Sequence, residues 1–112
     1  MTHSSEALLR HMLLCLDRIT EYTGGGQANF LMDAKTQDAV IRNLEVIGQA
    51  VKDGGIERLA ESDPDIAWRQ IGDLRNVLAH QYLGVDARLV WNIVENELPK
   101  LRTAVVKMLE SP

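Results

Sequence analysis

Apolar side chains recur every three or four residues along most of this chain, which is the spacing of one face of an α-helix. The first two apolar stripes comprise Leu8, Met12, Cys15, Leu16 and Ile19, then Val40, Leu44, Ile47 and Val51. Ser4 or Ser5 is a candidate N-cap for the first predicted helix, and Asp33 is the candidate for the second. Glycines at 24–26 and at 54–55 predict where these two helices end.

Two further apolar stripes follow in the second half of the chain. They comprise Ala67, Ile71, Leu74 and Leu78, then Val90, Val94, Leu98, Leu101, Val105 and Met108. Asp63 before Pro64 predicts the start of the third helix, because proline is favoured at the first helical position, and Gly84 predicts its end. Asp86 is the candidate cap of the fourth helix, in which Pro99 should produce a bend.

These elements predict an all-α fold, an up-and-down bundle of four main helices, with either a turn or a short fifth helix at residues 56–61. The glycines at 24–26 predict a flexible loop rather than a phosphate cradle, because no strand precedes them and no Lys with Ser or Thr follows. A chain of 112 residues suits a single domain, which we take to span residues 1–112.

Composition narrows the environment and the partners of the chain. Aromatic residues make up only 4% of it, which favours helices over strands. A net charge of −4 argues against general affinity for nucleic acid, so any such site must be local. A lone Cys15 is expected in the core and indicates a cytoplasmic protein. No signal peptide or membrane span is expected, because Arg10, Asp17 and Arg18 interrupt the first apolar stretch.

The residue patterns of several kinds of active site are missing. Neither Glu-x-x-His nor a pair of His four residues apart occurs, so no metal site and no cofactor are expected. Gly-x-Ser-x-Gly is absent, and Cys15 in an apolar stripe is expected to be an inert thiol. Trp68 and Trp91 lie within helical patterns, where we expect them to pack in the interior rather than to stack on bases.

One segment carries a denser set of functional side chains. Arg75, Asn76, His80 and Tyr82 lie within eight residues near the end of the third predicted helix. At about 100° per residue, Asn76 and His80 share one helix face. Arg75 and Tyr82 align on a neighbouring face, and neither pair coincides with the apolar stripe. From the residues alone, surface cations near a helix C-terminus are the stronger interpretation.

Cleavage of an RNA phosphodiester is the chemistry that this set of residues fits. The reaction removes a proton from the ribose 2′-hydroxyl, stabilises a charged phosphorane and protonates the leaving 5′-oxygen. Histidine can transfer the protons and arginine can hold phosphate oxygens, so no metal is required. One His and one Arg are few for this reaction. A two-fold dimer that brings two copies of Arg75 and His80 into one cleft is therefore a further hypothesis.

The motif Arg-Asn-x3-His-x-Tyr at residues 75–82 resembles the signature of HepT-like toxins, within the HEPN superfamily of ribonucleases. Further segments resemble family patterns in the expected order, namely residues 40–48, 65–71, 85–91 and Leu98-Pro99. The resemblance implies a HEPN-like homodimeric bundle that cleaves RNA without a metal. It also implies that Arg75 and His80 are catalytic and that Asn76 orients or polarises the site.

The resemblance further implies a partner and a means of control. Such toxins are usually paired with a nucleotidyltransferase antitoxin that transfers AMP from ATP to the motif tyrosine, here Tyr82. The added phosphate would block the cleft and compete with RNA for Arg75. Gln49 stands where family members commonly carry Glu, so an amide replaces a carboxylate. Arg42 and Asn43 could support the RNA backbone, with a solvated helix face as an equal alternative.

Two other functions stay open. The first is a non-catalytic HEPN-like interaction module that binds a nucleotidyltransferase, in which Tyr82 is a modification or docking site and His80 has no catalytic part. The second is a purely structural bundle, for which substitutions at Arg75, Asn76 and His80 would be silent.

Overall fold

The computed structural model describes residues 3–79, 84 and 86–110. Its elements, in chain order, are α1 (His3–Tyr22), α2 (Gly26–Met32), α3 (Ala34–Gly54), α4 (Ile56–Ser62), α5 (Trp68–Ala79), α6 (Ala87–Asn92), the π-helical turn η1 (Ile93–Glu97) and α7 (Leu98–Glu110). No strand occurs in these ranges, and the all-α prediction is confirmed.

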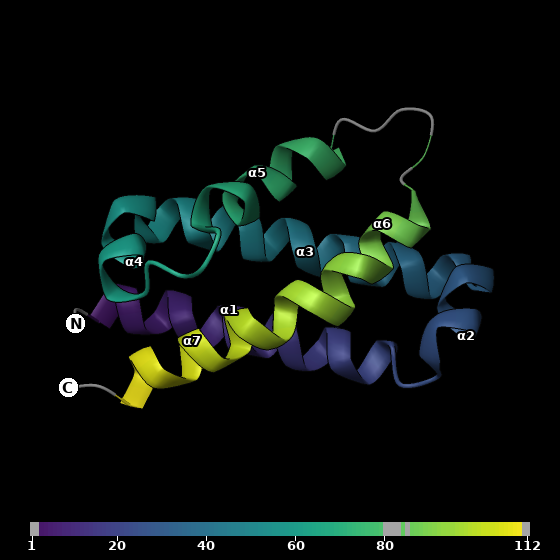
Figure 1. Ribbon diagram of the computed structural model, residues 1–112, viewed down its shortest axis with the longest axis horizontal. Coiled ribbons are helices and arrows are strands. Elements are labelled where there is room, and N and C mark those ends of the chain that lie inside the picture. The colour runs from purple at the N-terminus through teal and green to yellow at the C-terminus, as the bar shows by residue number, and fades with distance from the viewer. Residues whose placement is uncertain (1–2, 80–83, 85, 111–112) are drawn as a thin grey trace.

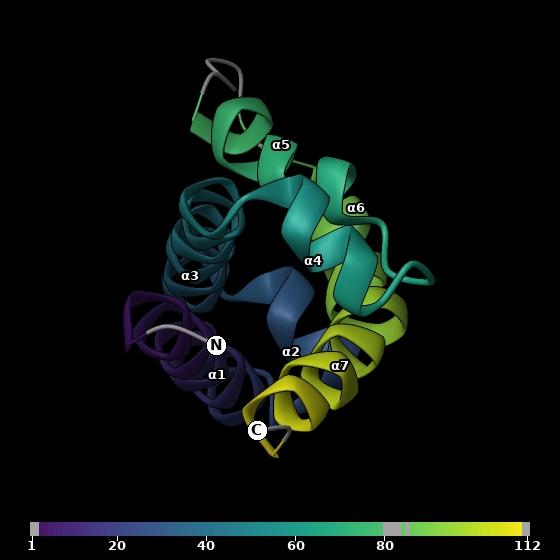
Figure 2. The ribbon, with the colours of Figure 1, turned by 90° about the vertical axis from the view of Figure 1, so that its left-hand side faces the viewer.

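The long helices alternate in direction, as in an up-and-down bundle (Figure 1). α1 and α3 lie side by side, α5 packs on α3, and α7 packs on α1. Viewed along the bundle, α7 lies next to α1, and the path from α6 to α7 lies across from α3 (Figure 2). The four predicted main helices are therefore α1, α3, α5 and the path from α6 to α7. The short fifth element is α4, and α2 is an additional short helix.

The predicted apolar stripes supply the core. Side chains with 2% exposure or less come from every main helix, for example Met12, Cys15, Leu16, Ile19, Val40, Leu44, Ile47, Val51, Trp68, Val90, Leu101 and Val105. Burial raises the pKa of the Cys15 thiol, as expected for an inert core residue. Within the described ranges, each helix is too short or too polar to cross a lipid bilayer.

The segment after α1 differs from the flexible loop that its glycines predict. The chain turns at residues 23–25, and α2 begins at Gly26, which has a positive φ of 87°. Phe30 of α2 is fully buried, and its ring centroid lies 5.5 Å from that of Trp91 on α6. A helix of seven residues is unstable alone, so this aromatic contact explains why the segment is helical.

Two predicted helix starts are wrong. Asp63 is the C-cap of α4 rather than the N-cap of the third helix, and α5 begins at Trp68. The Trp68 indole Nε1 donates a hydrogen bond of 2.8 Å to the Asp63 carbonyl. This bond gives the buried indole N–H an acceptor and ties the segment between α4 and α5 to the start of α5. Ala67, expected in the buried stripe, is exposed ahead of the helix. Ser4 and Ser5 lie inside α1, which starts at His3.

The irregularity predicted as a bend at Pro99 takes the form of the π-helical turn η1, directly before α7. Proline has no N–H for the carbonyl four residues earlier, and its ring crowds that carbonyl, so a regular α-helix cannot continue there. A π turn inside an α-helix accommodates the mismatch. Val90 before the turn and Leu101 after it are both fully buried, so the fourth helix keeps one face toward the core.

Asp33 caps α3 as predicted. Its carboxylate accepts hydrogen bonds from the backbone N–H groups of Lys35 at 3.1 Å and Thr36 at 3.3 Å, and from the Thr36 hydroxyl at 2.9 Å. The Thr36 hydroxyl contributes most to lowering the pKa of Asp33, and the backbone donors add to the effect. Asp86 caps α6 in the same manner, by accepting from the Arg88 N–H at 2.9 Å.

Asp33→Ala should destabilise the protein at pH 7, because two N–H groups at the start of α3 lose their acceptor. The pKa of Asp33 is lowered by folding, so its contribution is complete above the ordinary pKa of an aspartate and is lost as the pH falls through the lowered value. Urea unfolding should therefore show a difference from wild type that shrinks in strong acid. Asp38→Ala, an exposed change on α3, is the control, and equal stability of both variants at pH 7 would refute the cap.

Candidate functional site

Gly48 sets the distance between α3 and α5. A Cβ atom at this position would lie 2.9 Å from the Arg75 amide nitrogen and 2.9 Å from the Ile71 carbonyl oxygen. Both are backbone atoms, which cannot rotate away as a side chain can, so the close approach requires glycine. The contact holds the backbone of Arg75 directly against α3.

A surface hollow of about 420 Å³ lies beside this contact. Its lining comes from three helices: Leu8 and His11 of α1, then Arg42, Glu45, Val46, Gln49, Ala50 and Asp53 of α3, then Arg75 and Ala79 of α5. We call it the α1/α3/α5 hollow. Three of the predicted site residues, Arg42, Gln49 and Arg75, are therefore brought together by the fold.

The two arginines in the hollow are placed differently. The Arg42 Nη1 atom lies 3.7 Å from Glu45 Oε2, in an ion pair whose arginine is 74% exposed and which is therefore weak. The Arg75 Nη1 atom donates to Asn76 Oδ1 at 3.4 Å. No carboxylate pairs with Arg75 in the part of the chain that the structure describes. The remaining guanidinium donors of Arg75 therefore suit an anionic ligand such as a phosphate.

Gln49 holds a carboxylate in the hollow although it is itself an amide. Its Nε2 atom donates a hydrogen bond of 2.9 Å to Asp53 Oδ1, one helical turn further along α3. The hollow thus contains the acidic groups of Glu45 and Asp53 beside its two arginines. Glu45 forms an ion pair with Arg42, and Asp53 accepts a hydrogen bond from the Gln49 amide.

The other predicted site residues are placed as follows. Asn43 is buried and donates from Nδ2 to the Ala39 carbonyl at 2.9 Å, so it packs within α3 and does not line the hollow. Asn76 is exposed on α5 next to Arg75. His80 and Tyr82 lie outside the described residues. Ala79, which directly precedes His80, lines the hollow.

Three chemically capable residues of the hollow were not predicted as site residues from the sequence, namely His11, Glu45 and Asp53. They line the same hollow as Arg75 only because α3 packs on both α1 and α5. One signal could have indicated this packing. Gly48 lies inside a long apolar helix pattern, where a residue with no side chain suggests that another backbone passes close by.

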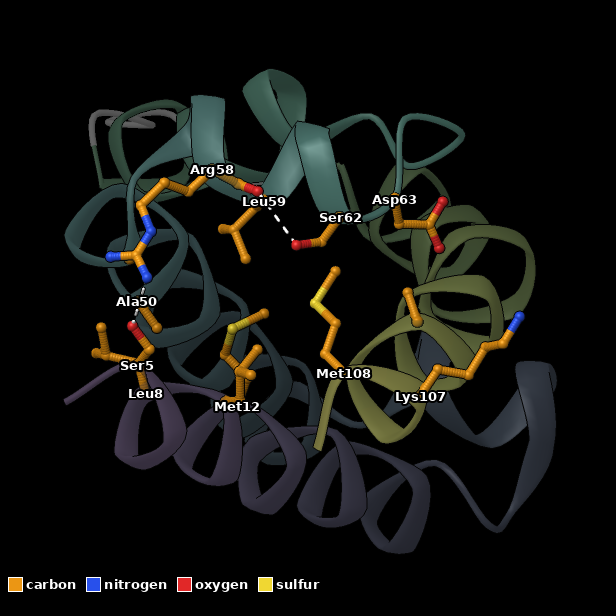
Figure 3. A pocket seen from close by; sticks show the side chains of 13 residues that line it. Ser5, Leu8, Met12, Ala50, Arg58, Leu59, Ser62, Asp63, Lys107 and Met108 are labelled. Atoms are coloured by element: carbon orange, nitrogen blue, oxygen red, sulfur yellow. Dashed lines mark hydrogen bonds between the residues drawn. The ribbon is translucent and has the colours of Figure 1, made fainter. Parts of the chain in front are cut away.

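A larger hollow of about 530 Å³ lies at one end of the bundle, where α4 covers the space between α1 and α7 (Figure 3). Met12, Leu59 and Met108 extend into it, and the Arg58 guanidinium donates to Ser5 Oγ at 3.2 Å on one edge. Of the predicted site residues that the structure describes, none lines this hollow. In those same ranges, no three His, Cys, Asp or Glu side chains are arranged to hold a metal ion.

Fold and site together define an all-helical bundle with arginines from two helices around one surface hollow. Comparison with known proteins identifies its family. Residues 12–108 match the family described as ribonuclease HepT-like, and the chain belongs to this family. The resemblance seen in the sequence motifs is thereby confirmed.

Individual relatives carry ribonuclease names. A protein of Thermococcus cleftensis named "Probable ribonuclease HepT" is 43% identical over 82 residues, which cover 71% of this chain and 72% of that protein. A Methanocaldococcus jannaschii protein named "Putative RNase" is 34% identical over 101 residues, 89% of this chain and 92% of that one. Another from the same organism, named "Gamma-glutamylcyclotransferase and putative RNase", is 36% identical over 103 residues. The match covers 91% of this chain but 46% of that longer protein. No solved structure gives a significant match.

Gly48→Ala should push α5 away from α3, because the added methyl group would overlap two backbone atoms. Overpacking of this kind costs about 1 to 3 kcal/mol, which urea unfolding would measure. Gly54→Ala is the matched control on the same helix, since a Cβ there would meet Leu59 Cδ1 at an ordinary 3.7 Å. Equal stability of Gly48→Ala and this control would show that α3 and α5 do not require glycine at position 48.

Proposed function

We propose that this protein is a metal-independent endoribonuclease, with the α1/α3/α5 hollow as its active site. One observation carries the proposal, which is that Arg42 and Arg75 from different helices line the same hollow and that Ala79, directly before His80, lines it too. The ribonuclease HepT-like family of the chain and the names of its relatives support the same activity.

The chemistry follows from the residues of the motif. A base removes the proton from a ribose 2′-hydroxyl, the 2′-oxygen attacks phosphorus, and the bond from phosphorus to the 5′-oxygen breaks as that oxygen gains a proton. His80 takes part in proton transfer, and Arg75 stabilises the charge that develops on the phosphorane oxygens. Asn76 accepts a hydrogen bond from Arg75 and so orients its guanidinium. Arg42 binds the neighbouring backbone phosphate.

The protein acts as a homodimer in this proposal, and pairing about a two-fold axis near α5 would double the positive charge of the cleft. Val77 of α5, which lies inside the motif, is 48% exposed, and Leu89 of α6 is 52% exposed. Single exposed aliphatic side chains are common on protein surfaces. The support for the dimer is therefore chemical, because one His and one Arg per motif are few for a reaction that benefits from both an acid and a base.

Control comes from a nucleotidyltransferase antitoxin, which makes the protein the toxin of a toxin–antitoxin pair. The phenolic oxygen of Tyr82 attacks the α-phosphorus of ATP, the bond to the β-phosphate oxygen breaks, and pyrophosphate leaves while the phenol loses its proton. The product carries a phosphodiester two residues from His80. Its negative charge would compete with RNA for Arg75.

Purified protein should cleave RNA in the presence of a metal chelator. Arg75→Ala and His80→Ala should each lower the single-turnover rate by about 100-fold or more, because each removes a group that acts mainly in the transition state. Arg69→Ala is the matched control, an exposed arginine of α5 that does not line the hollow, and should keep the wild-type rate. Wild-type protein that is inert on RNA would leave the non-catalytic interaction module as the better function.

Tyr82→Phe should keep the cleavage rate but escape silencing by the nucleotidyltransferase partner and ATP, because only the phenolic oxygen is lost. Mass spectrometry would locate the added AMP on wild-type protein, and the cleavage assay would report its effect. Tyr22→Phe, on the exposed end of α1, is the control and should still be silenced. Continued silencing of Tyr82→Phe would show that another residue is modified.

A further inference from the structure

Arg18 lies on the same flank of α1 as His11, which lines the α1/α3/α5 hollow. The two residues are seven positions apart in one helix, so their directions differ by only about 20°. They are separated by about 10 Å along the helix axis, or about two turns. Both side chains are exposed. This flank of α1 therefore presents Arg18 at the surface, beyond the edge of the hollow.

The same flank of α1 faces α3. The two helices lie side by side (Figure 1), and the buried Cys15 of α1 lies between His11 and Arg18 in the sequence. Burial has the largest effect on the pKa of the Cys15 thiol and raises it, whereas the charges of Arg18 and of Arg42 on α3 both act to lower it. Because such an effect weakens with distance, both guanidinium groups lie near this one sulfur. Arg18 and Arg42 therefore lie on one side of the bundle, along the boundary between α1 and α3.

The acidic residue next to Arg18 is turned away from this boundary. Asp17 forms an ion pair with Arg102 of α7, on the side of α1 that packs on α7. In the ranges that the structure describes, no carboxylate lies within ion-pair distance of Arg18. The guanidinium of Arg18 is therefore suited to an external anion, and its planar fork of donors matches phosphate oxygens.

Three arginines from three helices thus follow one another over the surface, and we call Arg75, Arg42 and Arg18 the arginine row. Arg42 is the member that joins the other two, because it lines the hollow with Arg75 and lies near Cys15 as Arg18 does. The row leads out of the hollow along the boundary between α1 and α3. A row of cations suits the backbone of a single strand, which carries one phosphate per nucleotide. On a chain with a net charge of −4, affinity for RNA must come from such a local feature.

We propose that Arg18 binds a further backbone phosphate of the RNA, so that the strand leaves the α1/α3/α5 hollow between α1 and α3, past Arg42 and then Arg18. The proposal rests on the ribonuclease function proposed above and adds the path of the substrate outside the hollow. In this scheme Arg75 acts on the phosphate that is cleaved, and Arg18 adds affinity for a longer strand without taking part in the reaction.

The test compares two RNAs of different length that cannot be cleaved, both with 2′-O-methyl groups. A trinucleotide has two phosphates, which Arg75 and Arg42 can hold without reaching Arg18. An oligonucleotide of about 12 nucleotides is long enough to follow the whole row. Affinity for the full-length protein is measured by NMR titration for the trinucleotide and by fluorescence anisotropy, at several salt concentrations, for the longer RNA.

Arg18→Ala should weaken binding of the longer RNA by about 3- to 10-fold and leave the affinity for the trinucleotide unchanged. The slope of log affinity against log salt concentration should become shallower by about 0.7, the value for one phosphate contact of a single strand. Arg18→Lys should keep most of the affinity, because the charge is retained. Arg10→Ala is the matched control, because it removes the same charge from an exposed arginine of α1 that pairs with Glu6 and does not line the hollow. This control should bind both RNAs as wild type does.

The outcomes separate the path from the function on which it rests. If Arg18→Ala binds the longer RNA as tightly as wild type, the path is refuted, and cleavage of RNA by wild type would leave the ribonuclease proposal standing. An equal loss of affinity for both RNAs also refutes the path, because Arg18 then acts on the hollow or on folding. If only the longer RNA loses affinity while wild type fails to cleave unmodified RNA, the path is supported and the ribonuclease proposal fails.

Discussion

Two backbones meet at Gly48 without a side chain between them, and this contact sets the position of α5, which carries Arg75, relative to the groups of the proposed site on α3. The Arg75 amide nitrogen lies so close to α3 that a Cβ atom at position 48 would be only 2.9 Å from it. Arg75 therefore projects beside the α3 residues Arg42 and Gln49 rather than away from them. Overpacking at this point would shift α5 as a unit, because a close-packed interior transmits strain.

Charge in this protein is organised locally rather than over the whole surface. The chain carries a net charge of −4, which opposes general attraction to RNA. Arg42 and Arg75 line the hollow together with Glu45 and Asp53, and these two carboxylates already have partners on α3. In the proposed function, a phosphate would be held at this one point on an otherwise acidic molecule.

Most of the fold could be predicted from the sequence because the apolar stripes have helical spacing and their ends carry caps. Asp33 and Asp86 begin helices as expected, since their side chains act locally on the next few N–H groups. The errors arose where tertiary contacts decide the structure. Phe30 packs on Trp91, which stabilises α2 as a helix. The indole of Trp68 bonds to the Asp63 carbonyl, and α5 begins at Trp68 rather than at Pro64.

The residues of the candidate site also fall into two groups, those that the sequence could predict and those that depend on helix packing. Arg75 and Asn76 could be recognised because they are adjacent within one motif, and the structure places both on the exposed face of α5. Arg42 and Gln49 were candidates only through the family resemblance, and the packing of α3 on α5 explains their part in the hollow. His11 gave no signal in the sequence, because its relation to Arg75 exists only after α1, α3 and α5 have packed together.

The most direct test of the site is to locate bound RNA on the folded protein. A short 2′-O-methyl RNA cannot be cleaved by attack of its 2′-oxygen, and backbone NMR shifts would report where it binds to wild-type protein. We predict shifts concentrated at Gly48, Gln49 and Arg75 around the α1/α3/α5 hollow. Shifts concentrated instead at Arg58, Ser62 and Lys107, around the larger hollow at the end of the bundle, would contradict the proposed site.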